Sequence, residues 1–329
     1  MYFNNLDFLI LGIYCIGIIG LAQYVSRDKS GIEKTSEDYF LAGRSLPWWA
    51  IGASLIAANI SAEQIIGMSG QGFVVGMAIA VWELTAAVAL IVMAKYFLPL
   101  FLEKKIYTMP QFLEQRYDHR VRLVMAFFWL GVYIFVNLTS VLWLGALALN
   151  TVAGLDIVQG MVLLGLFAVG YSLYGGLKAV AFTDIIQVVL LVLGGLMIAW
   201  IMLDKVSDGS GVLAGFQILT ERAPEKFDMI LNRDNPHYAS LPGLSVLLGG
   251  MWIMNISYWG FNQYIIQRAL AAKNLSEAQK GIVFAAFLKI LMPLIVVLPG
   301  ILVFIVNSSL DSPDQAYPTA MSFLPVGVK

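Results

Sequence analysis

Long apolar stretches separated by short polar segments run through almost the whole chain. An apolar helix needs about 20 residues to cross the ~30 Å hydrocarbon core of a bilayer. On that scale the sequence predicts eight membrane-spanning helices: Asp7–Tyr24, Trp48–Met68, Val75–Leu98, Leu123–Thr151, Val158–Tyr174, Ile185–Leu203, Leu244–Tyr264 and Gly281–Val306. Two further helices are expected at the membrane surface, an amphipathic one over Pro110–Tyr117 and another around Val212–Arg222.

Composition supports this class of protein. The 329 residues are 59% hydrophobic and 12% charged, about half the charged fraction of an ordinary soluble domain. The net charge of −1 argues against a nucleic-acid surface. The single cysteine, Cys15, lies in an apolar run, and both histidines, His119 and His237, fall in polar loops. The sequence therefore offers neither a Cys/His metal cluster nor a catalytic candidate, and we expect no enzyme activity.

Basic residues settle the predicted orientation, because cytoplasmic loops are enriched in lysine and arginine. The loops near Gly70–Gly76 and Asn150–Ile157 contain neither. The loops after the first, third, fifth and seventh spans contain Arg27, Lys29, Lys34 and Arg44; Lys95, Lys104, Lys105, Arg116, Arg120 and Arg122; Lys178; and Arg268, Lys273 and Lys280. We therefore expect a multi-pass protein of the plasma (inner) membrane whose partner is the lipid bilayer and whose N-terminus lies outside.

The second predicted span is interrupted by a polar stretch, Ala57–Gln64. Asn59, Ser61, Glu63 and Gln64 lie far from both ends of this span. Polar residues at such a depth usually line a cavity or a pathway, and the small residues around them allow the helix to unwind. The stretch therefore predicts the broken helix of a transporter, with backbone carbonyls available to a cation.

Four other spans carry polar residues to a similar depth. At about 1.5 Å per residue, Glu83 lies roughly 12 Å and Asn255 roughly 17 Å from the outer ends of their spans. Asn137 lies roughly 21 Å and Lys289 roughly 12 Å from the inner ends of theirs. All four therefore fall near the midplane, level with the polar stretch. Any single one could simply hold two helices together. Five spans that converge on one level predict a shared cavity.

The residues of this band suit a neutral ligand. Glu83 and Lys289 can neutralise each other, while Gln64, Asn137 and Asn255 add neutral donors and acceptors. A sugar needs such a mixed set, because each hydroxyl both donates and accepts. On the seventh span Asn255, Tyr258, Trp259 and Asn262 share a face, on which aromatic rings could stack against a sugar. The alternative is that these aromatic residues face lipid.

Two local features lie between the fifth and sixth spans. The pair Gly175–Gly176 suits a tight turn. Asp184 sits at the predicted start of the sixth helix, where a carboxylate can cap the N-terminus. A vestibule for a departing cation is the alternative role for Asp184.

Several motifs resemble the sodium/solute symporter family, and within it the bacterial sodium/galactose (sodium/glucose-type) branch. They are Glu37-Asp-Tyr-Phe-Leu-Ala-Gly-Arg-Ser-Leu-Pro-Trp-Trp49, Ala57–Gln64, Tyr171–Ala179, Thr183–Gln187 and Tyr258–Arg268. The resemblance implies an all-α membrane fold of two inverted five-helix repeats (LeuT-type) preceded by one extra helix. Within a single domain over residues 1–329, it places the extra helix at 7–24, the first repeat at 47–203 and the start of the second at 242–329.

The resemblance also implies a function and its residues: uptake of a monosaccharide (galactose or glucose type) coupled to sodium, by alternating access. It assigns the sugar to Gln64, Glu83, Asn137, Asn255, Lys289 and Tyr258. It assigns the gates to Asn59, Met68, Trp82 and Tyr258. It assigns sodium to the backbone carbonyls of Ala57 and Ile60, with Asp184 on its exit path.

The chain departs from the family in three respects. Ala86 stands where a sugar-binding hydroxyl is expected one turn after Glu83, and Trp82 replaces a tyrosine. The later helices of the second repeat, which complete the sodium site, are absent, so we expect the chain to be C-terminally truncated. Another cargo of the same family, an amino acid or a carboxylate, remains an alternative function, as does a membrane sensor with a signalling domain after Lys329. Glu63 receives no role.

Overall fold

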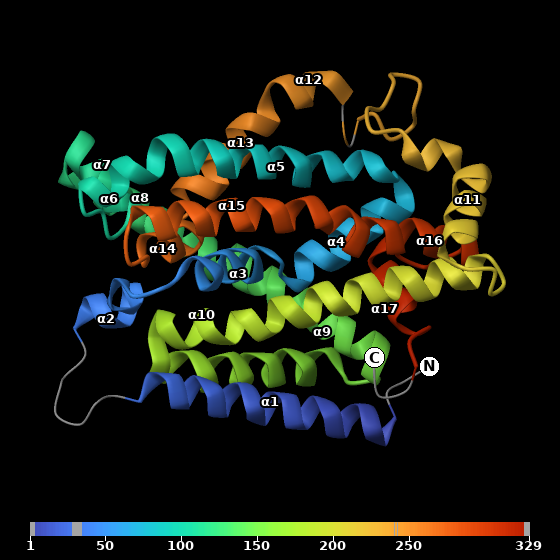
Figure 1. Cartoon of the computed structure of the whole chain (residues 1–329), viewed down its shortest axis with the longest axis horizontal. Coiled ribbons are helices and arrows are strands. Elements are labelled where there is room, and N and C mark those ends of the chain that lie inside the picture. Colours follow the sequence, from blue (N-terminus) through green and yellow to red (C-terminus); the bar gives the residue numbers. More distant parts are fainter. Residues whose placement is uncertain (1–3, 28–34, 240, 242, 326–329) are drawn as a thin grey trace.

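The computed structural model describes residues 4–27, 35–239, 241 and 243–325, and these form a bundle of helices (Figure 1). Within those ranges the only β pairing is an isolated bridge between Leu46 and Ala272. Four parts of the sequence named above lie outside the described residues: Lys29, Lys34, the first residue of the expected second repeat at 242, and Lys329.

The first half of the chain contains α1 (Asn5–Ser26), α2 (Ser36–Leu41), η1 (Ala42–Arg44), α3 (Trp48–Asn59), α4 (Ala62–Val74), η2 (Met77–Ala80), α5 (Val81–Val92), η3 (Met93–Phe97), α6 (Leu98–Glu103), α7 (Met109–Arg116), α8 (His119–Val132), η4 (Tyr133–Leu138) and α9 (Thr139–Ala153). The second half contains α10 (Ile157–Val206), α11 (Val212–Arg222), η5 (Pro224–Phe227), α12 (Gly243–Leu248), α13 (Gly250–Phe261), α14 (Gln263–Leu270), α15 (Leu275–Met292), η6 (Pro293–Val297), α16 (Leu298–Val306), η7 (Pro313–Gln315) and α17 (Ala316–Met321).

Most of the predicted spans are present as long apolar helices. Within the described ranges, five are long and apolar enough to cross a membrane: Asn5–Ser26, Met77–Glu103, His119–Ala153, Gly175–Val206 and Leu275–Val306. A bent pair, α3 and α4, counts as a sixth. The two other predicted spans do not meet this length criterion as single helices. Ile157–Leu173 is apolar but short, and the predicted span Leu244–Tyr264 is divided among α12, α13 and α14.

α10 is a hairpin rather than one rod, as its two legs in Figure 1 show. The chain reverses at Gly176, whose φ of 58° and ψ of −157° suit glycine, and a Cβ there would lie 2.5 Å from the Tyr39 carbonyl oxygen. The predicted glycine turn is thus confirmed. The second leg begins before the predicted residue Ile185, so Asp184 lies inside the helix. The prediction that Asp184 caps an N-terminus was therefore wrong.

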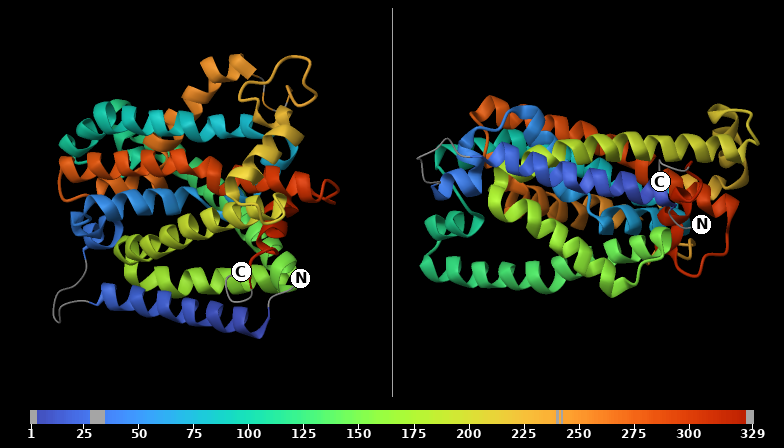
Figure 2. Two further views of the ribbon diagram at one scale, coloured as in Figure 1. Left: turned by 45° about the vertical axis from the view of Figure 1, so that its right-hand side comes forward. Right: turned by 90° about the horizontal axis from the view of Figure 1, so that it is seen from below.

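The helices lie side by side in a flattened bundle (Figure 2). α3 is central, in contact with α10, α14 and α15, while α1 lies along α10 and α5 packs between α13 and α15. The predicted cytoplasmic segments α2, α7 and α14 gather at one end of the bundle, and α11 lies at the other (Figure 1). Arg44, Arg116 and Arg268, which belong to or follow these segments, therefore lie toward the same end. A helix with the predicted bounds Val212–Arg222 is confirmed as α11, and the predicted helix Pro110–Tyr117 appears as α7.

A buried lysine joins the segment after α11 to the end of α4. Lys226 is 8% exposed, and its Nζ donates to the carbonyl oxygens of Phe73 (2.9 Å) and Val74 (2.8 Å). The same Nζ lies 4.2 Å from the centre of the Phe304 ring. Burial lowers the pKa of this ammonium group below its ordinary value. Lys226 therefore caps two carbonyls at the C-terminus of α4, where a cation also complements the helix dipole.

Replacement of Lys226 by methionine should destabilise the protein by about 1–3 kcal/mol, because both carbonyls lose their donor. The expected result is a lower midpoint of thermal unfolding in detergent. Lys104→Met is the matched control, because Lys104 is exposed. Its free energy of unfolding should stay within about 0.5 kcal/mol of the parent value, so its midpoint should hardly move. Equal midpoints for the two variants would contradict a capping role for Lys226.

Candidate functional site

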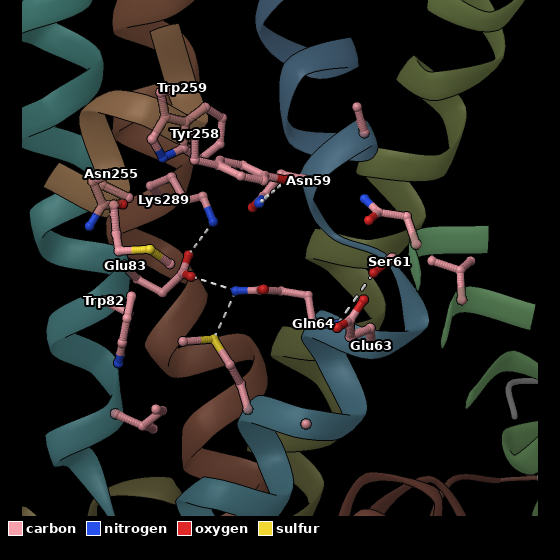
Figure 3. Close-up of a pocket in the computed structure, with 18 of the residues that line it drawn as sticks. Asn59, Ser61, Glu63, Gln64, Trp82, Glu83, Asn255, Tyr258, Trp259 and Lys289 are labelled. Atoms are coloured by element: carbon pink, nitrogen blue, oxygen red, sulfur yellow. Dashed lines mark hydrogen bonds and ion pairs between the residues drawn. The ribbon is translucent and has the colours of Figure 1, made fainter. Parts of the chain in front are cut away.

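A cavity of about 790 Å³ lies between the two halves of the broken helix and the spans that face them (Figure 3). This volume is typical of a small-molecule site. The predicted residues that line it are Asn59, Gln64, Met68, Trp82, Glu83, Asn137, Asn255, Tyr258, Trp259 and Lys289. The structure thus brings together the polar band that helix depth predicted. Lining residues without a predicted role include Glu63, Gln71, Tyr133, Tyr264 and Asp314.

An ion pair forms one wall of the cavity. Lys289 Nζ lies 2.5 Å from Glu83 Oε2, and the two residues are 1% and 2% exposed. Gln64 Nε2 donates to the other carboxylate oxygen at 2.6 Å and also contacts Met68 Sδ at 3.0 Å. The pair is electrically neutral, and both hydrogens of the Gln64 amide have partners. Gln64 therefore offers the cavity its carbonyl oxygen.

Asn255 is fixed in a similar way by a residue that the sequence analysis missed. Its Nδ2 donates to Thr85 Oγ1 (3.0 Å) and to the Met251 carbonyl (3.1 Å). The Thr85 hydroxyl itself donates to the Val81 carbonyl (2.8 Å), so it can only accept from Asn255. Both amide hydrogens of Asn255 are thus used, and its Oδ1 remains as an acceptor. A threonine two residues after Glu83 was the available signal, although α-helical back-bonding is an equally common role.

Tyr258 lines the cavity beside the helix break. Asn59 Nδ2 donates to the Tyr258 hydroxyl (3.1 Å), and that hydroxyl lies 2.7 Å from the hydroxyl of Tyr264. The predicted neighbours Asn59 and Tyr258 are therefore in contact. The Asn59 Oδ1 is buried and has no hydrogen-bond partner within the described ranges. Asn262, predicted on the same face as Tyr258, does not line the cavity but accepts from Tyr133 (2.8 Å).

The helix break lies where the polar stretch predicted it. α3 ends at Asn59, α4 begins at Ala62, and the two axes differ by 64°. Ser61 caps α4: the Gln64 amide donates to Ser61 Oγ at 3.4 Å, while the Ser61 amide donates to the Asn59 carbonyl at 3.0 Å. The carbonyls of Ala57 and Ile60 therefore lack their usual amide donors four residues on. Such freed carbonyls suit a cation, but neither residue lines the cavity.

Asp184 lies in a separate buried network between α3, α10 and α14. It is 4% exposed, accepts from Ser54 Oγ at 2.5 Å, and lies 4.0 Å from Arg268 Nη2. Arg268 Nε donates to the Ser54 carbonyl (3.1 Å) and hydroxyl (2.9 Å). Asp184 therefore pairs with Ser54 and Arg268 inside the bundle rather than capping a helix as the sequence had predicted. It does not line the cavity.

Comparisons with known proteins agree with this architecture. Residues 39–325 match the family described as "Sodium:solute symporter family". The chain is 53% identical to a sodium/glucose cotransporter of Vibrio parahaemolyticus, over 98% of this chain and 63% of that protein. It is 41% identical to an uncharacterized symporter of Escherichia coli, over 89% and 52% of the two chains. A human sodium/myo-inositol cotransporter 2 is 33% identical, over 94% of this chain and 46% of that protein.

A solved structure shares the fold. It is the substrate-bound, outward-open state of a Na⁺-coupled sialic acid symporter, with a TM-score of 0.83 and 23% identity, over 99% of this chain and 67% of the other. At this identity the likeness concerns the fold alone. The chain spans between 46% and 63% of the length of the three relatives above.

Proposed function

This chain belongs to the sodium:solute symporter family, and we propose that it takes part in sodium-coupled uptake of a monosaccharide of the galactose or glucose type. Its fold is the all-α, inverted five-plus-five helix (LeuT-type) arrangement with one extra N-terminal helix, of which about eight spans are present. We assign the extra helix to residues 7–24, the first repeat to 47–203 and the beginning of the second to 242–329.

The observation that carries the choice of substrate is the distribution of acceptors in the cavity. Gln64 and Asn255 each use both amide hydrogens on protein partners, so each presents a carbonyl oxygen. Glu83 is neutralised by Lys289. Sugar hydroxyls can donate hydrogen bonds to such acceptors. A carboxylate has no hydrogen to donate, so its oxygens and these carbonyl oxygens would face each other without a hydrogen bond. The cavity thus favours a neutral polyol over the amino acid or carboxylate cargo of the alternative.

The remaining assignments form part of the same proposal. Asn137 binds the sugar together with Gln64, Glu83, Asn255 and Lys289, while Tyr258 stacks on the sugar ring. Met68 and Trp82 belong to the outer gate, and Tyr258 with Asn59 belongs to the inner gate. Sodium binds the freed carbonyls of Ala57 and Ile60 and leaves past Asp184. The protein spans the plasma membrane many times, with its N-terminus outside.

Uptake into proteoliposomes tests the proposal. Radiolabelled galactose and glucose are supplied with an inward gradient of sodium or of choline, and unlabelled amino acids and carboxylates serve as competitors. The chain is assayed alone and joined to the part of the Vibrio relative that it does not match. Uptake that needs sodium and is reduced by sugars supports the proposal. Equal uptake in sodium and choline, or competition by amino acids instead of sugars, would contradict it.

Thr85→Val should weaken sugar binding without a large loss of stability. Valine has nearly the shape of threonine but leaves one Asn255 amide hydrogen without its acceptor, so the amide can turn its NH₂ toward the cavity. We expect roughly tenfold weaker binding, which corresponds to the loss of about one hydrogen bond. Equilibrium binding of labelled galactose measures it. Thr85→Ser keeps the hydroxyl and should bind like the parent, and equal affinities for the two variants would contradict this role.

A further inference from the structure

The short helix α14 (Gln263–Leu270) is separated from α13 by a break, and three contacts join the helix and the break to α13, η4 and α3. Gln263 and Gln267 also bond to backbone atoms of Tyr107, Met109 and Phe40. Asn262, between the two helices, has φ of −80° and ψ of 120°, which is extended rather than helical. Its side chain is 5% exposed. The break lies one helical turn beyond Tyr258, at the predicted cytoplasmic side of the cavity. A short helix after such a break can move without the rest of the span.

The first contact joins Tyr264 on α14 to Tyr258 on α13. Their hydroxyl oxygens lie 2.7 Å apart, and the rings meet edge to face with centres 6.2 Å apart. The Tyr258 hydroxyl also accepts from Asn59. The resulting chain, Asn59 to Tyr258 to Tyr264, crosses from α3 over the base of the cavity to the far side of the break. Tyr258 therefore has two partners, only one of which was predicted.

The second contact fixes the break itself. The Tyr133 hydroxyl donates to Asn262 Oδ1 at 2.8 Å. Tyr133 begins the π-helical segment η4, stacks on Trp129 with ring centres 5.5 Å apart, and meets the Tyr264 ring edge to face at 5.7 Å. π-helical segments often occur at functional sites because they present a side chain out of the regular register. Here the segment brings a hydroxyl to the bend.

The third contact ties the end of α14 to α3. Arg268 Nε donates to the carbonyl and hydroxyl oxygens of Ser54, and the same guanidinium donates to the Tyr264 carbonyl. Arg268 therefore joins its own helix to the first half of the broken helix. Its buried counter-charge is Asp184. Motion of α14 is thus coupled to α3, which carries Asn59.

We infer that α14 is the movable half of the inner gate, that Tyr264 holds Tyr258 across the cavity, and that Asn262, pinned by Tyr133, is the hinge. The inference rests on the proposed transport function, to which it adds Tyr133, Asn262 and Tyr264. The hydroxyl contacts of Tyr264 and Tyr133 join uncharged groups, so they can break and re-form during a transport cycle at low cost.

Access of a thiol reagent to the cavity from the cytoplasmic side tests the inference in the full-length protein. Gly67→Cys provides the probe, because Gly67 lines the cavity and a Cβ there meets no heavy atom within 4 Å. Cys15→Ser removes the native thiol of the chain. Inside-out vesicles are treated with a membrane-impermeant maleimide in the absence of sugar, and the labelling rate of residue 67 is measured.

Tyr264→Phe and Tyr133→Phe should each raise this rate roughly fivefold, as expected for the loss of one hydrogen bond that favours the closed state. Tyr107→Phe is the control, because its hydroxyl bonds to Glu37 away from the cavity, and its rate should not change. Tyr258→Phe loses both hydroxyl contacts and should label at least as fast. If Tyr258→Phe alone raises the rate, the inference fails while the predicted gate stands. Labelling needs neither sodium nor sugar, so failure of the transport proposal would appear separately, in the uptake assay.

Discussion

Glu83→Gln and Lys289→Met should each destabilise the protein by about 3–5 kcal/mol, the largest effects that we expect for single charge removals in this chain. Each variant leaves one charge buried without its partner, since the two residues are 2% and 1% exposed. In Lys289→Met the Glu83 carboxylate keeps only the Gln64 amide. In Glu83→Gln the Lys289 ammonium keeps a neutral amide oxygen and the face of Trp259, 5.2 Å away, but no counter-charge. Thermal unfolding in detergent measures the loss.

The double variant Glu83→Gln/Lys289→Met separates stability from binding. With both charges removed, no unpaired charge remains, so the unfolding midpoint should recover most of the loss. Sugar binding should not recover, because the charge-assisted donors and acceptors of the cavity wall are gone. The exposed pair Glu114–Arg122, 2.7 Å apart, is the control, and Glu114→Gln should leave the midpoint unchanged. Single variants as stable as the parent would show that the pair does not hold α5 and α15 together.

The level of the cavity could be predicted from the sequence because helix rise is constant. Counting residues from the span ends placed Glu83, Asn255 and Lys289 at one depth, and the structure joins α5, α13 and α15 at that depth. The helix break was predictable for a related reason. Asn59 and Ser61 interrupt an apolar span, and the serine acts as the N-cap of the second half.

The rotation of each helix about its axis could not be predicted in the same way. Asp184 was expected to cap a helix. Instead, the hairpin at Gly176 brings its carboxylate into contact with the hydroxyl of Ser54, 130 residues earlier in the chain. Tyr133 and Tyr264 have polar tips within apolar or interfacial segments, where a tyrosine can equally face lipid. The packing of η4 against the break brings the Tyr133 hydroxyl to Asn262, and the break itself turns Tyr264 back toward Tyr258, six residues earlier. The first pair depends on a tertiary contact and the second on a break in the helix, and the apolar pattern encodes neither.

The close packing of α4 against α16 depends on a glycine, Gly300. α4 carries Gln64 and Met68 into the cavity and packs against α16 through very close backbone contact. A Cβ on Gly300 would lie 2.0 Å from the Ser69 carbonyl oxygen and 3.0 Å from Ser69 Oγ. Membrane helices often use small residues to approach each other in this way. The backbone atom of Ser69 cannot turn aside as a side chain could.

Gly300→Ala should therefore destabilise the protein by about 3 kcal/mol, the upper end for overpacked sites, and should push α4 away from α16. Two neighbouring glycines of α10 complete a graded series. A Cβ on Gly195 would meet the Ile295 side chain, at 2.1 Å from Cγ2, which can shift in part, so Gly195→Ala should cost less. A Cβ on Gly194 would meet nothing within 4 Å, so Gly194→Ala should be neutral or gain up to about 1 kcal/mol from helix propensity.

Unfolding midpoints that fall in the order Gly194→Ala, Gly195→Ala, Gly300→Ala would attribute the loss to contact between helices, because the chemical change is the same in all three. Galactose binding gives the second readout. Displacement of α4 would carry Gln64 away from Glu83, now 2.6 Å apart, so Gly300→Ala should bind sugar more weakly even below its unfolding midpoint. Gly194→Ala, which leaves α4 in place, should bind like the parent. Equal midpoints and affinities for all three variants would mean that α4 and α16 can separate freely, and the outer half of the broken helix would then not be a fixed wall of the cavity.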